Sequence, residues 1–105
     1  PDGAVPSELL TMFQAMGSAA QKITNKTGLV IATRNTEMAL EVERDDDEMD
    51  KLHRQLISTL VDPNWKHGVE PAIDLTLLGR YYERYADHAV SVSRRVYFLV
   101  TGKYA

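Results

Sequence analysis

Apolar residues recur every three or four positions along three long stretches of the chain, with polar residues between them. This spacing is typical of amphipathic helices that pack through one apolar stripe. The first stripe consists of Leu9, Phe13, Met16, Ala20, Ile23, Thr27 and Val30. The second consists of Met38, Val42, Met49, Leu52, Leu56 and Leu60. The third consists of Leu75, Leu78, Tyr82, Tyr85, Ala89, Val92, Val96 and Leu99. The pattern therefore predicts three packed helices.

Capping and helix-breaking residues separate the three stripes. Asn35 or Thr36 can cap the second helix, and Pro63 ends it because the residue before a proline leaves the helical region. Gly102 is a suitable terminator for the third helix. The expected helices cover residues 7–34, 37–61 and 69–101. Since no segment alternates long enough for a strand, the predicted fold class is all-α, one up-down-up three-helix bundle over residues 1–105.

Composition and charge narrow the classes of function. The chain has 105 residues, of which 44% are hydrophobic, and this suits one globular domain. The formal net charge is -3, so no basic surface indicates nucleic-acid binding. The absence of cysteine excludes a disulfide framework and a thiolate metal site. No apolar run approaches the roughly 20 residues needed to cross a bilayer, so we expect no segment to insert directly into the membrane.

Acidic residues are concentrated in the second predicted helix. This run contains Glu41, Glu43, Asp45, Asp46, Asp47, Glu48 and Asp50. Asp46 and Asp50 are four residues apart, and Glu83 and Asp87 repeat this spacing on the third helix. Like charges at that spacing destabilise an isolated helix by a few tenths of a kcal/mol, roughly. Adjacent antiparallel helices would bring both pairs to similar heights, where four carboxylates can bind a hard cation through oxygen.

Other interpretations of the charged residues remain open. The acidic run can be a solvated face without a ligand. Arg80, Arg84 and Arg94 can also form ion pairs with the second acidic pair, which would then need no metal. Asp45 falls near the apolar stripe, where an unpaired charge is costly, so we expect an arginine partner or a frayed, exposed stretch there. Catalysis is not expected, because the chain lacks a Glu-x-x-His pair, a glycine-rich phosphate loop and a nucleophile set.

Several of these segments resemble the PhoU family. Residues 83–89, Glu-Arg-Tyr-Ala-Asp-His-Ala, and residues 96–102, Val-Tyr-Phe-Leu-Val-Thr-Gly, are similar to the closing helix of that family. Residues 46–50, Asp-Asp-Glu-Met-Asp, resemble its second-helix motif. Residues 62–68, Asp-Pro-Asn-Trp-Lys-His-Gly, look closest to the actinobacterial, PhoY-like branch. The resemblance extends from about residue 43 to residue 102 and fits the carboxy-terminal repeat of the family.

This resemblance implies a function. PhoU proteins are non-catalytic negative regulators of the phosphate regulon, and they link the high-affinity phosphate transporter to a membrane sensor histidine kinase. The implied partners are the ATPase subunit of the transporter and the kinase. The implied location is the cytoplasm, peripherally at the inner face of the cell membrane. Because the family has two repeats and one is recognised here, we also expect a homo-oligomer, such as a dimer. The alternative is a carboxylate-rich metal-binding bundle with a storage or redox role.

The resemblance also assigns roles to individual residues. Some family members bind multinuclear iron or zinc, or magnesium or manganese, through pairs of acids four residues apart. The implied metal ligands here are Asp46, Asp50, Glu83 and Asp87. The residues expected to contact a partner are Arg80, Arg84 and His88. His88 matches the histidine of the family motif, but we do not expect it to be a ligand.

Overall fold

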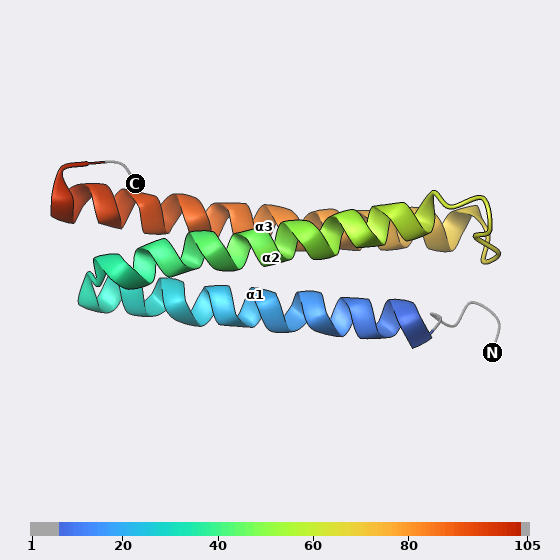
Figure 1. Cartoon of the computed structure of the whole chain (residues 1–105), viewed down its shortest axis with the longest axis horizontal. Coiled ribbons are helices and arrows are strands. Elements are labelled where there is room, and N and C mark those ends of the chain that lie inside the picture. The colour runs from blue at the N-terminus through green and yellow to red at the C-terminus, as the bar shows by residue number, and fades with distance from the viewer. Residues whose placement is uncertain (1–6, 104–105) are drawn as a thin grey trace.

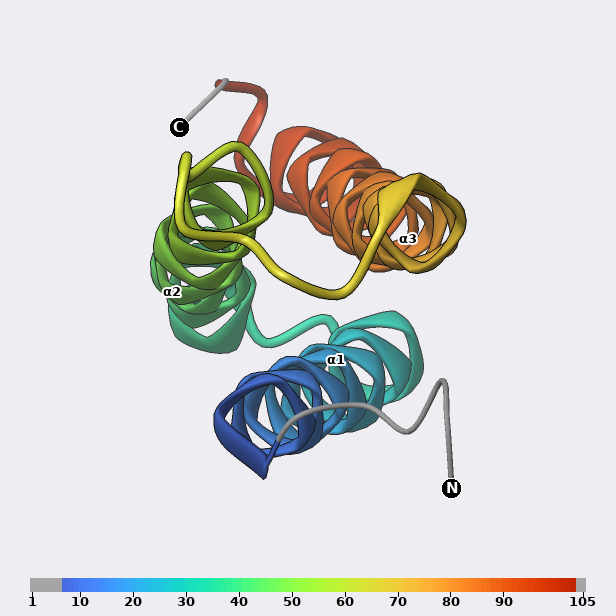
Figure 2. The ribbon, with the colours of Figure 1, turned by 90° about the vertical axis from the view of Figure 1, so that its right-hand side faces the viewer.

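The computed structural model describes residues 7–103 and contains three α-helices (Figure 1). They are α1 (Ser7–Thr33), α2 (Thr36–Leu60) and α3 (Val69–Thr101). Each helix runs antiparallel to the one before it, and the end view shows the three helices at the corners of a triangle (Figure 2). The bundle measures 52 × 21 × 16 Å. The predicted all-α, three-helix fold is confirmed. Among the described residues, no helix has the length and apolarity needed to cross a membrane.

The helix ends have local causes. Asn35 caps α2, because its side chain accepts a hydrogen bond of 3.0 Å from the backbone N–H of Met38. This settles the choice that the sequence left open between Asn35 and Thr36. Arg34, directly after α1, has a φ of 58°, which lies in the left-handed region that commonly ends helices. Gly102 ends α3 with a φ of 74°, a conformation that glycine adopts without a steric penalty.

The stripes predicted on α1 and α2 form most of the core. The largest fully buried side chains are Leu9, Met16, Ile23, Val30, Val42, Met49, Leu56 and Ser93. Trp65, in the loop between α2 and α3, packs against this core. Its indole Nε1–H donates a hydrogen bond of 2.8 Å to the carbonyl oxygen of Gly68. The core therefore extends along the bundle to the loop that joins α2 and α3.

The stripe predicted on α3 is partly wrong. Leu78, Tyr85 and Leu99 are 42%, 41% and 69% exposed, respectively. The buried side of α3 consists of Leu75, Gly79, Ala86, Ala89, Val90 and Ser93. Most of these residues are small, and they let α3 approach α2 closely, since a Cβ atom on Gly79 would overlap Leu56 Cδ2. Hydrophobic spacing ignores this preference for small residues, so it placed the packed side of α3 incorrectly.

Candidate functional site

The side of α2 that faces α1 has its acidic residues paired with lysines. Lys26 Nζ lies 3.0 Å from both Glu41 Oε1 and Asp45 Oδ2, and Lys22 Nζ lies 3.5 Å from Asp45 Oδ1. The hydrogen bonds to Asp45 and Glu41 raise the pKa of Lys26 above its usual value. Asp45 is buried in an intact helix, so the expected arginine partner or frayed stretch is wrong. Two lysines from α1 compensate this charge instead.

The side of α2 that faces α3 forms two polar pairs at different heights. Arg94 Nε on α3 donates a hydrogen bond to Glu43 Oε1 on α2, and this pairing raises the pKa of Arg94. Nearer the loop that joins α2 and α3, His53 Nδ1 lies 2.9 Å from Glu83 Oε2. The sequence had suggested that Arg94 can pair with the acidic residues of α3, but in the structure it pairs with Glu43 of α2 instead. These two pairs stand on either side of a group of aspartates.

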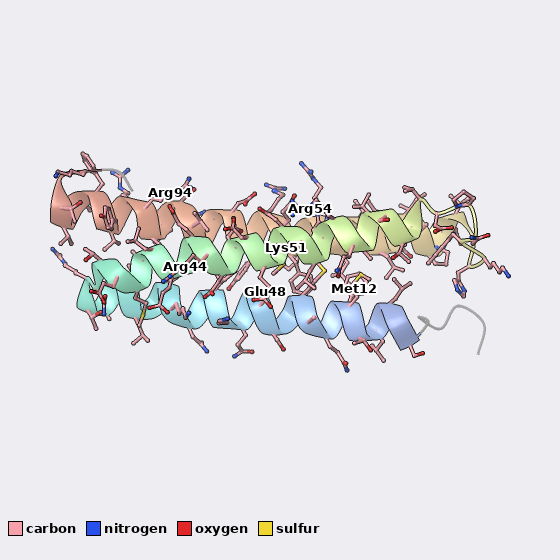
Figure 3. The ribbon with its side chains drawn as sticks, viewed as in Figure 1. Met12, Arg44, Glu48, Lys51, Arg54 and Arg94 are labelled. Atoms are coloured by element: carbon pink, nitrogen blue, oxygen red, sulfur yellow. The ribbon has the colours of Figure 1, made fainter. Side chains whose placement is uncertain are left out.

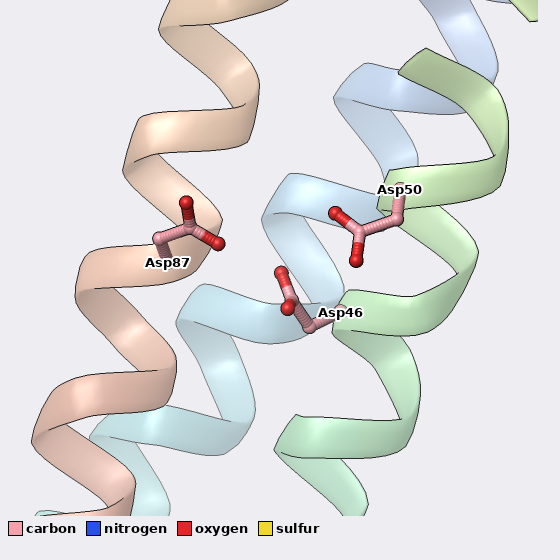
Figure 4. A group of neighbouring side chains, drawn as sticks. All are labelled: Asp46, Asp50 and Asp87. Atoms are coloured by element: carbon pink, nitrogen blue, oxygen red, sulfur yellow. The ribbon is translucent and has the colours of Figure 1, made fainter. Parts of the chain in front are cut away.

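Three aspartates meet between the two pairs. Asp46 and Asp50 extend from α2 toward α3, and Asp87 extends from α3 toward them (Figure 4). One carboxylate oxygen from each residue lies within 4.8 Å of the others. We call these three residues the aspartate cluster. Within residues 7–103, none of the three forms an ion pair with a basic side chain.

The aspartate cluster holds negative charge that no ion pair among the described residues neutralises. Asp46 Oδ1 is buried and has no hydrogen-bond partner among the described residues. Burial, followed by repulsion from Asp50 and Asp87, raises the pKa of Asp46 from 3.8 to about 6. Burial and the neighbouring carboxylates of Glu83 and Asp87 also raise the pKa of Asp50. An orphaned, partly buried carboxylate oxygen is costly, and a bound cation would remove that cost.

The donor atoms of the aspartate cluster suit a hard cation. All three are carboxylate oxygens, the ligands that Mg²⁺, Mn²⁺ and Ca²⁺ prefer, and the group contains neither a thiolate nor an imidazole of the kind found in most zinc sites. The structure thus brings together three of the four expected ligands, Asp46, Asp50 and Asp87. The fourth, Glu83, lies next to them but is held by His53.

The residues expected to contact a partner lie on the exposed surface of α3. Arg80, Arg84 and His88 are all exposed. Within the described part of the chain, neither arginine pairs with Glu83 or Asp87. The exposed side of α2 is also charged, with the side chains of Arg44, Glu48, Lys51 and Arg54 (Figure 3). The surface around the cluster is therefore rich in charges of both signs.

A cleft of about 610 Å³ adjoins the aspartate cluster at Asp46 and is open to a partner. It is lined by Glu37, Leu40, Glu41, Glu43, Arg44, Asp46, Asp47, Val90 and Arg94.

The sequence did not single out His53 as the partner of Glu83, or Lys22 and Lys26 as partners of the acidic run. Lys22 and Lys26 did carry a signal, because two lysines four residues apart lie on one side of a helix.

Comparison with known proteins places this bundle in a family. The model of the PhoU domain matches residues 13–96. The phosphate-specific transport system accessory protein PhoU homolog 1 of Mycobacterium leprae is 47% identical over 104 residues, which are 99% of this chain and 47% of the relative. PhoU homolog 2 of Mycobacterium tuberculosis is 46% identical over 104 residues, 99% of this chain and 49% of the relative. The PhoU homolog of Synechocystis is 30% identical over 99 residues, 93% of this chain and 44% of the relative.

This chain spans about half the length of the curated relatives that it matches. No solved structure matches it. The higher identity to mycobacterial proteins agrees with the actinobacterial branch that the loop sequence suggested. Because the family model covers most of the chain and includes all three aspartates of the cluster, the family resemblance is confirmed, and the chain belongs to the PhoU family.

Proposed function

We propose that this chain is a non-catalytic regulatory domain of phosphate-specific transport. In this role it restrains the phosphate regulon by linking the ATPase subunit of the high-affinity phosphate transporter to a sensor histidine kinase. It acts in the cytoplasm, at the inner face of the cell membrane. The observation that carries the proposal is the 47% identity, over 99% of this chain, to a relative named as an accessory protein of that transport system.

We further propose that the aspartate cluster binds a divalent cation, with Mg²⁺ and Mn²⁺ as the best candidates. Asp46, Asp50 and Asp87 would hold the ion, and Glu83 would add a fourth carboxylate next to it. The buried, unpartnered Oδ1 atom of Asp46 and the all-oxygen donor set support this assignment. Such an ion would neutralise part of the acidic groove and change the charge that a docking protein meets.

The groove between α2 and α3 is the surface that we expect the partners to contact. Asp87, Arg80, Arg84 and His88 are exposed on α3 and offer both signs of charge. Exposed charges of this kind steer association and set specificity. A storage or redox role is less well supported, since the cluster has three carboxylates and no histidine, whereas di-iron bundles use two Glu-x-x-His pairs and two further glutamates.

Co-purification with both proposed partners tests this function. The wild-type chain should retain the transporter ATPase subunit and the cytoplasmic part of the kinase. Asp87→Lys should reduce retention by about tenfold or more, because it reverses an exposed charge in the groove. The matched control is Asp74→Lys, which makes the same change at another exposed position of α3.

Two results would count against the proposed function. In the first, the wild-type chain retains neither partner under conditions in which circular dichroism shows it to be folded. In the second, Asp87→Lys and Asp74→Lys retain the partners equally well, so that the groove between α2 and α3 plays no special part.

A further inference from the structure

The imidazole ring of His53 is packed between α2 and α3, beside the aspartate cluster. Its side chain is 15% exposed, and its Nδ1 atom lies 2.9 Å from Glu83 Oε2. A Cβ atom on Gly79 would lie 3.2 Å from His53 Cδ2, so the glycine at this position makes room for the ring. Packing against α3 therefore holds the ring at the place where it meets Glu83.

The two nitrogen atoms of this ring have different surroundings. Nδ1 faces a carboxylate oxygen, which accepts a hydrogen bond but has no proton to donate when it is ionised. Nε2 is buried and has no hydrogen-bond partner among residues 7–103. A proton on Nε2 alone would be buried without an acceptor, which is costly. The tautomer that fits these surroundings carries its proton on Nδ1, so that this N–H faces Glu83.

Glu83 borders the aspartate cluster without being one of its three members. Burial, followed by the charge of Glu83, raises the pKa of Asp50, so the carboxylates of Glu83 and Asp50 are close enough to repel each other. His53 engages Oε2 of Glu83, and a carboxylate has a second oxygen that can serve another ligand. In metal sites, a ligand that a neighbouring side chain holds in this way keeps its orientation.

We infer that His53 is a positioning residue of the cation site, and that it holds Glu83 through Nδ1 so that Glu83 supplies the fourth carboxylate beside the aspartate cluster. This inference rests on the cation binding proposed above. His53 does not contact the cation in this role, because it acts through Glu83. Removal of such an outer partner typically lowers metal affinity by about 10–100-fold.

Other basic side chains do not take the place of His53. Arg80 and Arg84 are close to Glu83 in the sequence, but neither pairs with it in the part of the chain that the structure describes. Arg94 is engaged by Glu43. Among the described residues, His53 is therefore the one basic side chain that pairs with Glu83, so a change at His53 tests the hold on this carboxylate directly.

Calorimetric titration of Mn²⁺ into the cation-free chain tests this role. His53→Leu removes the donor at similar volume and should weaken Mn²⁺ binding by about tenfold. His53→Asn should restore the affinity to within about threefold of the wild type, because its amide Nδ2 is bonded to the γ carbon as Nδ1 is in histidine. His67→Leu makes the same change at an exposed position of the loop between α2 and α3 and should leave the affinity unchanged. If circular dichroism shows that His53→Leu is unfolded, His53→Ala replaces it.

A double-mutant cycle separates positioning from a general structural effect. Glu83→Gln should itself weaken Mn²⁺ binding by about tenfold, and adding His53→Leu to it should cause no further loss, because His53 acts through Glu83. Equal Mn²⁺ affinities of the wild type and His53→Leu, or losses that add in the double variant, would overturn the inference and leave cation binding by the aspartate cluster intact. A wild-type chain that binds no Mn²⁺ would overturn both.

Discussion

At the scale of single residues, Glu83 and Asp87 show how neighbours on another helix decide the state of a side chain. They lie one turn apart on α3 and carry the same charge. Glu83 Oε2 lies 2.9 Å from His53 Nδ1, whereas Asp87 faces Asp46 and Asp50. The sequence treats both acids alike because it does not reveal which residue of α2 lies at the same height. Glu83 is thus held by the protein, while Asp87 is available to a cation or a partner.

Gly79 is the residue most sensitive to a small change in volume. We predict that Gly79→Ala lowers the free energy of unfolding by about 1–3 kcal/mol, because the added Cβ atom overlaps Leu56 Cδ2 in the tight contact between α2 and α3. Gly28→Ala is the matched control, since a Cβ atom there meets nothing within 4 Å. It should raise the free energy of unfolding by about 0.5–1 kcal/mol through helix propensity.

Urea unfolding of both glycine variants, followed by circular dichroism, measures these differences. A stabilised Gly79→Ala would mean that α2 and α3 are farther apart than the structure places them. That outcome would also undermine the explanation given above for the packed side of α3.

At the scale of the helices, α2 tolerates its dense acidic run because its neighbours compensate most of it. Lys22 and Lys26 of α1 pair with Asp45, and Arg94 of α3 pairs with Glu43. The residues left without a basic partner on the α3 side are Asp46 and Asp50. The helix thus combines a set of acids held in ion pairs with a second set that forms no ion pair. The second set belongs to the aspartate cluster.

This imbalance predicts how stability depends on pH. The pKa of Asp46 is raised to about 6 in the folded protein, so the folded state binds this proton more tightly than the unfolded chain does. Without a divalent cation, the free energy of unfolding should therefore rise as pH falls from about 7.5 to about 5.5. Asp50, whose pKa is also raised, contributes in the same direction. This stabilisation is lost as pH rises through the pKa that Asp46 has in the folded protein.

Asp46→Asn isolates the contribution of this group. It should be more stable than the wild type near neutral pH by about 1 kcal/mol, a value reduced for screening by solvent, and it should show a weaker pH dependence. Asp74→Asn, at an exposed position of α3 away from the cluster, should behave like the wild type. Urea unfolding at the two pH values, in the presence of a chelator, checks both variants. A free energy of unfolding of the wild type that decreases as pH falls from about 7.5 to about 5.5 would contradict the proposed repulsion between the carboxylates.

The helices could be predicted from the sequence because their signals are local. Asn35, Pro63 and Gly102 act through the backbone next to them, so they locate the helix ends without knowledge of the rest of the fold. The packed side of α3 and the partners of the acids could not be predicted. Gly79 has its effect through contact with Leu56, and His53 through contact with Glu83. Such contacts depend on how two helices are rotated and aligned, and a single helix does not encode this.

The aspartate cluster was partly predictable for the same reason. The spacing of acids identified the sides of α2 and α3 that face each other, and Asp46, Asp50 and Asp87 do meet. The spacing could not show that Glu83 lies outside the cluster, because this depends on the contact between Glu83 and His53. The comparison with relatives then supplied what geometry alone does not, namely the family to which the bundle belongs.

At the scale of the whole molecule, the grooves between the helices differ in charge. The groove between α2 and α3 carries the aspartate cluster, whereas the groove between α1 and α3 has no charged residue in its lining. Because these two grooves share no residue, substitutions in the groove between α1 and α3 should leave cation binding by the aspartate cluster unchanged.

Calorimetric titration of Mn²⁺ into the cation-free protein near neutral pH tests the central claim most directly. The account predicts saturable binding by the wild type and by Asp47→Asn, with affinity reduced about tenfold or more in Asp50→Asn and Asp87→Asn, since each loses one carboxylate ligand. Wild-type protein that shows no saturable binding, or Asp87→Asn that binds as tightly as the wild type, would contradict it.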